Sequence, residues 1–309
     1  MPELPEVETV KEVLKSKVLN KKIAKVNIYY SKIIEYPTTD EFIKELIGET
    51  INDLKRRGKW IIFELDHYAL LSHLRMEGKY NYKNVNDPLN KHEHVEFVFT
   101  DNTALRYQDT RKFGRMYLYP KEKVYEKEPL NELGLEPWDK NLTSDYLKEK
   151  YKSKHKEIKA ILLDQSIIVG IGNIYADEIL FLSKINPYKK ASELNDQELN
   201  EIIKNTKKVL EEAIKKGGTT IRTYTSSEGV HGLFQQELNV HQREDEPCRV
   251  CQTKIVKVKI GGRGTYYCPN CQKKWYSWTA QLLGFSSLLS FFYWKSFKFF
   301  FYNTLITND

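Results

Sequence analysis

Three observations predict that this chain is an α+β protein of several domains. An amphipathic helix comes first, strand periodicity follows from residue 22 to residue 119, and helix periodicity then replaces it. Close to the carboxyl end stand four cysteines in two C-x2-C pairs, which is the spacing of a zinc-binding hairpin. We therefore expect an amino-terminal helix with a β-sandwich, a helical domain and a zinc hairpin.

The first helix is expected directly after Pro5, since proline suits the first helical turn. Its apolar residues recur at steps of three and four, at Val7, Val10, Val13, Leu14 and Val18. The strands are expected in five short runs rich in β-branched and aromatic residues: "KIAKVNIYY", "KWIIFEL", "ALLSHL", "HVEFVFT" and "ALRYQD". Glycine, asparagine, aspartate and proline separate these runs, which favours a sandwich or a barrel.

The segment "ELGLEPWD" is predicted to be a linker to the helical domain. Helices are expected in "SDYLKEKYKSKHKEIKAILLDQ", "NIYADEILFLSKI" and "NDQELNEIIKNTKKVLEEAIKKG", with the glycine-bounded turn "VGIGN" between the first two. A loop at 217–234 is long for a structural connection, and we expect it to be mobile without a ligand. The expected domains are 1–131, 132–245 and 246–275, followed by a tail at 276–309.

Composition narrows the class of protein. The 309 residues carry a net charge of +7, a moderate excess that is compatible with nucleic acid but common elsewhere. The start of the chain has neither the cationic nor the apolar region of a secretory signal. All four cysteines stand in one short segment, so we expect a reducing cytoplasm rather than a secreted disulfide scaffold.

The cysteine segment is predicted to hold one structural zinc ion. The ligands are Cys248, Cys251, Cys268 and Cys271, and sixteen residues separate the two pairs. Two tight turns joined by a hairpin bring four thiolates to one tetrahedral ion, with no open position for chemistry. Free thiols or disulfides are the alternative. Arg263 stands in the hairpin "KIGGRGTYY" and is a candidate phosphate contact, with a merely solvated side chain as the alternative.

Together these features make the chain resemble formamidopyrimidine-DNA glycosylase, the bacterial enzyme that removes oxidised purines from DNA. The resemblance covers nearly all of residues 1–275. It rests on "PELPEVET", "RRGKW", "HLRMEGKY", "DTRKFGRM", "VGIGNIYADE", "GGTTIRTY" and the two C-x2-C pairs, in this order. It implies a helix–two-turn–helix module at 132–245 and a loop at 217–234 that folds over an extruded base.

The resemblance implies a catalytic set of Pro2, Glu3, Lys59 and Arg263. Loss of Met1 would leave Pro2 with a secondary amine, and an α-amino group titrates near pH 7.7–8.0, so part of it is a neutral nucleophile at neutral pH. Glu3 would shuttle protons beside it, with Glu6 in support. Taken alone, "MPE" is more simply a helix start with a favourable acid.

The resemblance also implies contacts with DNA. The expected residues are His73, Met76, His94, Arg111, Phe113, Lys159 and Asn173. Met76 and Phe113 suit wedging between bases, and Arg111 has donors for the cytosine left opposite the lesion. Lys59, His73, Asn173 and Arg263 would grip phosphates, while Lys159 would be a weaker backbone or base contact. Considered singly, Met76 and Phe113 are more often core residues, and Lys59 and His73 have a simpler reading as strand-end surface residues.

The implied function is a bifunctional glycosylase and abasic-site lyase of base excision repair. It would excise 8-oxoguanine and formamidopyrimidines from duplex DNA and nick the strand by β,δ-elimination. The expected partner is damaged double-stranded DNA, with no small-molecule cofactor, a monomeric enzyme and a bacterial cytoplasmic location. Two alternatives stay open: a glycosylase of the same fold for oxidised pyrimidines, and a non-catalytic DNA-binding protein with a zinc hairpin.

The tail at 276–309 departs from the family pattern. Twelve of its 34 residues are aromatic, and the twenty residues from Trp275 to Trp294 carry no charge. A membrane span, an interfacial or partner-binding segment, and the product of a frameshift or of read-through all remain open. We expect the tail to have no catalytic role.

Overall fold

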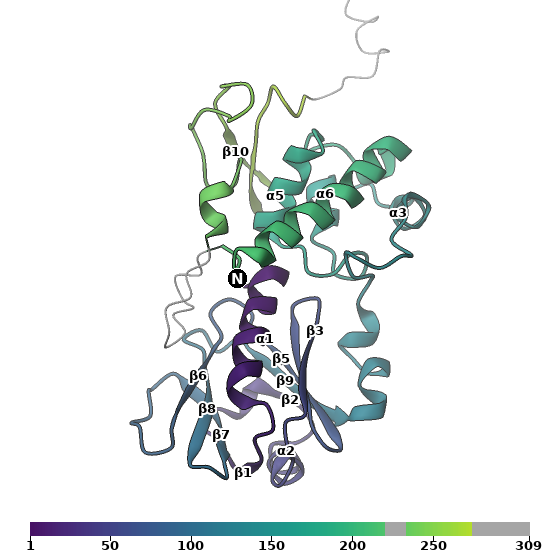
Figure 1. Cartoon of the computed structure of the whole chain (residues 1–309). Coiled ribbons are helices and arrows are strands. Elements are labelled where there is room, and N and C mark those ends of the chain that lie inside the picture. Colours follow the sequence, from purple (N-terminus) through teal and green to yellow (C-terminus); the bar gives the residue numbers. More distant parts are fainter. Residues whose placement is uncertain (220–232, 274–309) are drawn as a thin grey trace, which may run out of the picture. The chain divides into compact units, whose positions relative to one another are not determined.

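The computed structural model describes residues 1–219 and 233–273. The chain divides into two units, Met1–Gln272 and Lys273–Asp309. The expected tail at 276–309, and the expected mobile loop apart from its two ends, lie outside the described residues. Figure 1 draws the described residues in colour.

The amino-terminal part is a helix, α1 (Leu4–Val18), with two sheets. A four-stranded antiparallel sheet has the order β1-β7-β8-β6, and a five-stranded sheet has the order β2-β9-β5-β4-β3 with only the β2–β9 pair parallel. The strands are β1 (Ile23–Ile28), β2 (Ile34–Tyr36), β3 (Asp53–Arg57), β4 (Trp60–Glu64), β5 (Tyr68–His73), β6 (Lys79–Asn84), β7 (Glu93–Phe99), β8 (Thr103–Gln108) and β9 (Arg115–Pro120). The predicted α+β fold with a helix and two sheets is confirmed.

One hydrophobic core joins α1 to both sheets. Val7, Val10 and Leu14 of α1 are buried in the same cluster as Phe63 of one sheet and Phe97 of the other. Burying a side chain of this size stabilises the fold by about 1.5–3 kcal/mol relative to leaving it exposed. This packing fixes the amino terminus of the chain against the sheets.

Several elements were not predicted, and each has a physical reason. The helix α2 (Thr39–Leu46) lies within the region expected to be strands, and Thr38 and Glu41 form its capping box, which was a readable signal. The strands β2, β3 and β6 at sheet edges, and β9 inside the five-stranded sheet, also lie outside the five expected runs. β3 and β6 carry mostly polar and charged residues and β2 has three residues, so they lack an apolar pattern, whereas Met116 and Leu118 alternate in β9 and were a readable signal.

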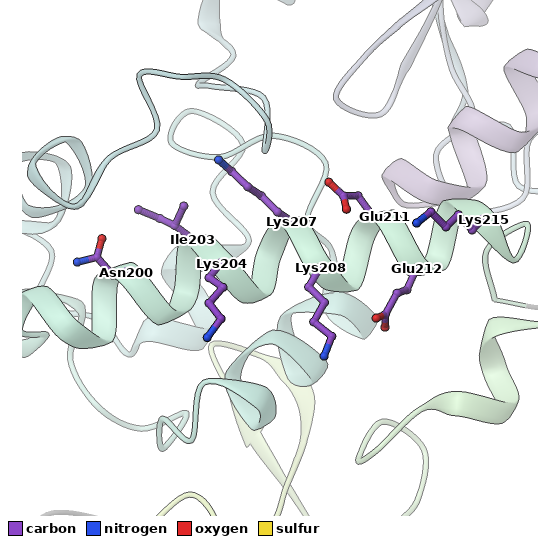
Figure 2. Close-up of a pocket in the computed structure, with 8 residues that line it drawn as sticks. All are labelled: Asn200, Ile203, Lys204, Lys207, Lys208, Glu211, Glu212 and Lys215. Carbon is purple, nitrogen blue, oxygen red and sulfur yellow. The ribbon is translucent and has the colours of Figure 1, made fainter.

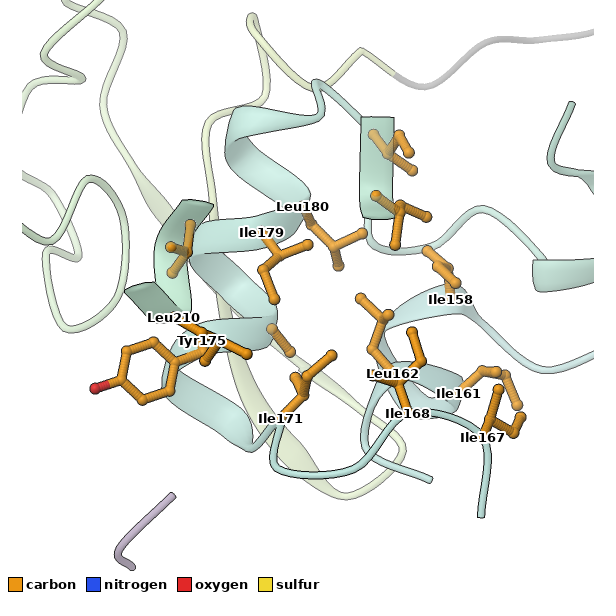
Figure 3. Close-up of a cluster of buried hydrophobic side chains, with 14 of the residues drawn as sticks. Ile158, Ile161, Leu162, Ile167, Ile168, Ile171, Tyr175, Ile179, Leu180 and Leu210 are labelled. Carbon is orange, nitrogen blue, oxygen red and sulfur yellow. The ribbon is translucent and has the colours of Figure 1, made fainter. Parts of the chain in front are cut away.

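The helical part contains α3 (Ser144–Tyr151), α4 (Ile158–Leu162), α5 (Asn173–Leu182) and α6 (Asp196–Lys215). The single helix expected over 144–165 is two helices, because the six residues between them are polar and offer no apolar face. Figure 3 shows the apolar side chains that hold α4, α5 and α6 together. Tyr175 lies at the edge of this cluster with its hydroxyl pointing away from it. Among the described residues, no helix is both long enough and apolar enough to cross a membrane.

The cysteine segment forms a two-stranded hairpin of β10 (Val256–Ile260) and β11 (Arg263–Tyr267). Gly261 and Gly262 make its two-residue turn with φ of +55° and +78°, which only glycine adopts readily. Gln272 joins the hairpin to the helical part, since its side chain donates to the Ile185 carbonyl and its carbonyl accepts from Asn186.

The linker between the sheets and the helices is held by ion pairs. The Glu136 carboxylate lies 3.0 Å from Arg56 and 3.1 Å from Arg57, and it accepts from the Gly58 amide at 2.7 Å. The linker also contacts the helical part. The Leu135 amide donates to the carbonyl of Ile167, which stands just before the glycine turn. One carboxylate thus ties the β3–β4 turn to the linker.

We predict that Glu136→Ala lowers the free energy of unfolding by about 2 kcal/mol, because the Gly58 amide loses its acceptor and Arg56 and Arg57 each lose one of their acceptors. Urea unfolding followed by circular dichroism measures the change. Glu132→Ala removes an exposed carboxylate from the same segment and is the matched control. An equal effect of the two substitutions would contradict this account of the linker.

Candidate active site

Glu3 joins the amino terminus of the chain to the start of α5. Its carboxylate is 2% exposed and accepts hydrogen bonds from the amides of Ile174 at 2.9 Å and Tyr175 at 3.4 Å. The free amides and the dipole of a helix both favour negative charge at this end. A residue of the sheet part therefore caps a helix of the helical part.

The glycines of the turn before α5 are required by this close approach. A Cβ on Gly172 would lie 2.2 Å from the Glu3 carboxyl carbon, and one on Gly170 would lie 2.3 Å from the Leu4 side chain. Gly170 also has φ of +88°, and its carbonyl accepts from the Leu4 amide at 3.1 Å. The turn "VGIGN" is thus shaped to receive the first residues of the chain.

Glu6 is a second buried carboxylate at the same place. It accepts from the Glu3 amide at 2.9 Å, from the Tyr175 hydroxyl, and from the Thr219 amide at 2.9 Å. Thr219 lies within the expected loop and is the last residue described before 220–232, and the Gly218 carbonyl accepts from the Phe234 amide at the other end of the loop. Glu6 therefore connects Glu3, α5 and the base of that loop. Pro2, the residue before Glu3 in the chain, is also buried.

Lys59 lies close to the two glutamates. Its Nζ donates to the Ile171 carbonyl at 2.8 Å, and the side chain is buried. Burial raises the pKa of Glu3, and the nearby Lys59 opposes that rise. Burial lowers the pKa of Lys59, and the two glutamates oppose that fall. A carboxyl that holds its proton more tightly and an amine that holds it less tightly are suited to proton transfer.

Asn173 and Arg263 bring the hairpin to this place. The Asn173 side-chain amide donates to the Gly264 carbonyl at 2.9 Å, and its Oδ1 is buried with no hydrogen-bond partner among the described residues. Arg263 is exposed on β11, near enough for its charge to contribute to the lowered pKa of Lys59. Of the predicted catalytic set, Glu3, Lys59 and Arg263 therefore gather at the start of α5.

His73 ends β5 and pairs with Trp60, the residue after Lys59. Its Nδ1 accepts from the Arg75 amide at 2.9 Å, which leaves the proton on Nε2. Burial, with Arg75 and Lys59 nearby, lowers the pKa of His73 to about 3. His73 is thus a neutral hydrogen-bond donor at physiological pH.

Met76, Arg111 and Phe113 lie on two loops. Met76 is partly buried, whereas Arg111 and Phe113 are exposed, and the guanidinium carbon of Arg111 stands 4.8 Å from the centre of the Phe113 ring. Asp109, which we did not predict, holds the second loop through the amides of Arg111, Phe113 and Gly114. An aspartate that opens a loop is a common turn signal, so this one was readable.

Two predicted DNA contacts are buried. His94 donates from Nε2 to the Asp109 carbonyl at 2.8 Å. In this structure it therefore holds the first residue of the second loop. The Lys159 ammonium is fully buried behind α5, where it donates to the Asn173 carbonyl and to Asp177, which also accepts from His241. The contacts of both residues are with other parts of the protein.

A hollow of about 540 Å³ lies along α6 (Figure 2), and it is lined by Asn200, Ile203, Lys204, Lys207, Lys208, Glu211, Glu212 and Lys215. None of the predicted site residues lines it.

The four cysteines fit one zinc ion. Their sulfur atoms lie within 4.8 Å of one another, with separations of 3.4 Å from Cys251 to Cys268, 3.5 Å from Cys251 to Cys271, and 3.9 Å from Cys248 to Cys271. Tetrahedral thiolate ligands at about 2.3 Å from zinc stand about 3.8 Å apart. The donor set is all sulfur, so the predicted structural zinc is confirmed.

Three family models match the chain. They are the formamidopyrimidine-DNA glycosylase N-terminal domain at residues 1–116, the H2TH domain of the same glycosylase at 133–225, and the zinc finger found in FPG and IleRS at 245–274.

Similar proteins were found by sequence and by structure. A formamidopyrimidine-DNA glycosylase of Oceanobacillus iheyensis is 49% identical over 88% of this chain and 98% of its own length. One of Bacillus cereus is 48% identical over 89% of this chain and 100% of its own length. Among solved structures, Lactococcus lactis Fpg in complex with DNA containing an abasic site is 39% identical, covers 88% of this chain and 100% of its own, and has a TM-score of 0.83.

We predict that Cys251→Ala abolishes zinc binding and lowers the melting temperature, because three thiolates no longer close the tetrahedral site. Metal analysis of the purified protein gives the stoichiometry, and calorimetry gives the melting temperature. Val250→Ala, at an exposed position between the first two cysteines, is the control and is expected to keep one zinc per chain. A variant that retains its zinc would refute the assigned ligand set.

We predict that His73 makes the protein sensitive to acid. The unfolded chain takes up a proton at this residue near pH 6.5, whereas the folded chain resists it down to about pH 3. The contribution of His73 to stability is therefore complete above pH 6.5 and is lost as the pH falls toward 3. Between about pH 6 and about pH 4.5 the loss is about 2 kcal/mol.

The variant His73→Asn keeps an acceptor for the Arg75 amide and removes the titration. Its free energy of unfolding is expected to fall less than that of the wild type over this range, as measured by urea unfolding. His155→Asn, at an exposed histidine, is expected to follow the wild type. Parallel curves for His73→Asn and the wild type would rule out this role.

Proposed function

The chain belongs to the formamidopyrimidine-DNA glycosylase family, and from that premise we propose that it is a bifunctional glycosylase and abasic-site lyase of base excision repair. The observation that carries the proposal is the buried Glu3 carboxylate, next to Pro2 in the chain, held on the α5 amides close to Lys59 and Arg263. This arrangement places the Glu3 carboxyl, Lys59 and Arg263 close to the amino terminus of the chain.

Pro2 is the proposed nucleophile. Removal of Met1 turns the Pro2 nitrogen from an amide into a secondary amine, and this amine attacks C1′ of the damaged nucleotide. A bond forms from nitrogen to C1′, the bond from C1′ to the base breaks, and the base leaves with a proton. Opening of the sugar ring gives an iminium ion that links enzyme and DNA.

Glu3 is the proposed proton carrier. Its raised pKa allows the carboxyl to protonate the sugar ring oxygen as the ring opens. The iminium withdraws electrons from the sugar, so loss of a proton from C2′ expels the 3′ phosphate, and a second elimination expels the 5′ phosphate. Hydrolysis of the iminium then releases the enzyme.

The proposed grip on DNA uses cations and fixed donors. Lys59 and Arg263 are suited to the phosphates around the extruded nucleotide, and His73 offers a neutral donor beside them. Asn173 stands at the start of α5, where helix amides also favour an anion. For Lys159 the buried ion pair with Asp177 supports an indirect role through α5 in place of a direct contact.

The proposed substrates are oxidised purines in duplex DNA. Solved structures similar to this chain are described as complexes with Fapy-dG-containing DNA and with carbocyclic 8-oxo-G-containing DNA. The enzyme would act as a monomer in the bacterial cytoplasm, without a small-molecule cofactor. The zinc ion would hold the hairpin that carries Arg263 and take no part in the chemistry.

We predict that borohydride reduces the iminium and traps a covalent complex of this protein with DNA containing 8-oxoguanine opposite cytosine. Pro2→Gly is expected to lower trapping by at least about two orders of magnitude, as is a form that retains Met1, because neither presents the proline amine. Gel electrophoresis of the labelled strand measures the complex. Pro37→Gly, distant in the chain, is the control.

The same assay separates the alternatives. A non-catalytic DNA-binding protein would give no covalent complex with the wild-type chain. A glycosylase for oxidised pyrimidines would cleave a thymine glycol duplex faster than an 8-oxoguanine duplex. Either result would contradict the proposal that the substrates are oxidised purines.

A further inference from the structure

The two loops with the proposed inserting residues leave neighbouring strands. The first loop, residues 74–78, follows β5 and carries Met76. The second, residues 109–114, precedes β9 and carries Arg111 and Phe113. Because His73 of β5 pairs with Arg115 of β9, the start of the first loop lies beside the end of the second.

Both loops close on one side chain, Tyr107 of β8. A Cβ placed on Gly78, at the end of the first loop, would lie 2.2 Å from the Tyr107 hydroxyl oxygen. A Cβ placed on Gly114, at the end of the second loop, would lie 1.9 Å from the same oxygen. Neither glycine has a positive φ, so both positions lack a side chain because of the space that Tyr107 takes, together with the Leu74 carbonyl at 2.5 Å from a Cβ on Gly78.

Tyr107 is itself held firmly. Its side chain is fully buried, and β8 lies between β6 and β7 with Tyr107 paired to Tyr80 on one side and Val95 on the other. The Tyr80 ring meets the Tyr107 ring edge to face at 5.2 Å, and the Tyr80 hydroxyl donates to Ser72. The hydroxyl that meets the two loops therefore has a fixed place in the sheet.

We propose that Tyr107 is a positioning residue that sets the separation between the two loops. Met76 on one loop and the stacked Arg111 and Phe113 on the other then enter the duplex as one prebuilt unit. This inference rests on the proposed function. It adds that selection of the base opposite the lesion depends on a buried hydroxyl that touches no DNA.

The physical basis is preorganisation. Asp109 ties the second loop through three backbone amides, and all three of these bonds stay within that loop. The Tyr107 hydroxyl supplies that distance, since both glycines lie against it. Without the Tyr107 hydroxyl oxygen, a small void remains between the two loops or the loops shift to fill it. The donors of Arg111 then lose their alignment with the base opposite the lesion.

The test is Tyr107→Phe, which keeps the ring and removes only the oxygen. Tyr151→Phe is the matched control, because Tyr151 is another fully buried tyrosine, in α3 of the helical part. Single-turnover excision is measured on duplexes with 8-oxoguanine opposite cytosine and opposite adenine. Borohydride trapping is measured on a single-stranded oligonucleotide with an abasic site, which has no opposite base.

We expect Tyr107→Phe to slow excision opposite cytosine on the order of tenfold and to reduce the preference for cytosine over adenine. Trapping on the single strand is expected to be unchanged, as are all three measurements for Tyr151→Phe. Gly114→Ala, which forces a methyl group against the same hydroxyl, is expected to reduce the preference in the same way.

The proposal is overturned if Tyr107→Phe keeps the preference for cytosine, or if trapping on the single strand falls as much as excision from the duplex. Failure of the proposed function would look different, because the wild-type chain would then not excise 8-oxoguanine from the duplex with cytosine, and there would be no preference to compare.

Discussion

The hydrogen bonds from the first amides of α5 to the Glu3 carboxylate are the interaction on which the rest of this structure depends. Glu3 belongs to the part of the chain that packs on the sheets, whereas α5 belongs to the helical part. One contact therefore both docks the two parts and holds the proposed acid. Burial of a carboxylate is costly, and the helix amides together with the nearby Lys59 offset part of that cost.

The same contact explains the local sequence on both sides. Gly172 leaves room for the Glu3 carboxyl, and Gly170 leaves room for Leu4. Glu6 fixes the Glu3 amide from the other direction and extends the connection to Thr219. The surroundings of the reactive terminus are thus set by groups that are distant in sequence and fully buried, which is how a site is preorganised.

Sequence patterns predicted the parts whose signal is local. The cysteine spacing, the periodicity of α1 and the apolar runs of β1, β4, β5, β7 and β8 each lie within a short window. The edge strands β3 and β6 and the division of α3 from α4 were missed because polar residues hide them. Burial of Lys159 against Asp177, and the meeting of Gly78 with Gly114 on Tyr107, depend on tertiary contacts that no window of the sequence contains.

The five-stranded sheet also sets the distance between the proposed chemistry and the proposed insertion. Lys59 precedes Trp60, which pairs with His73, and His73 pairs with Arg115 at the end of the second loop. Three adjacent strands therefore carry a proposed phosphate contact and the roots of both loops in fixed register. The strand register therefore holds the proposed phosphate contact and the proposed inserting loops in fixed positions relative to one another, which suits an enzyme that turns a base out of the duplex and fills the gap.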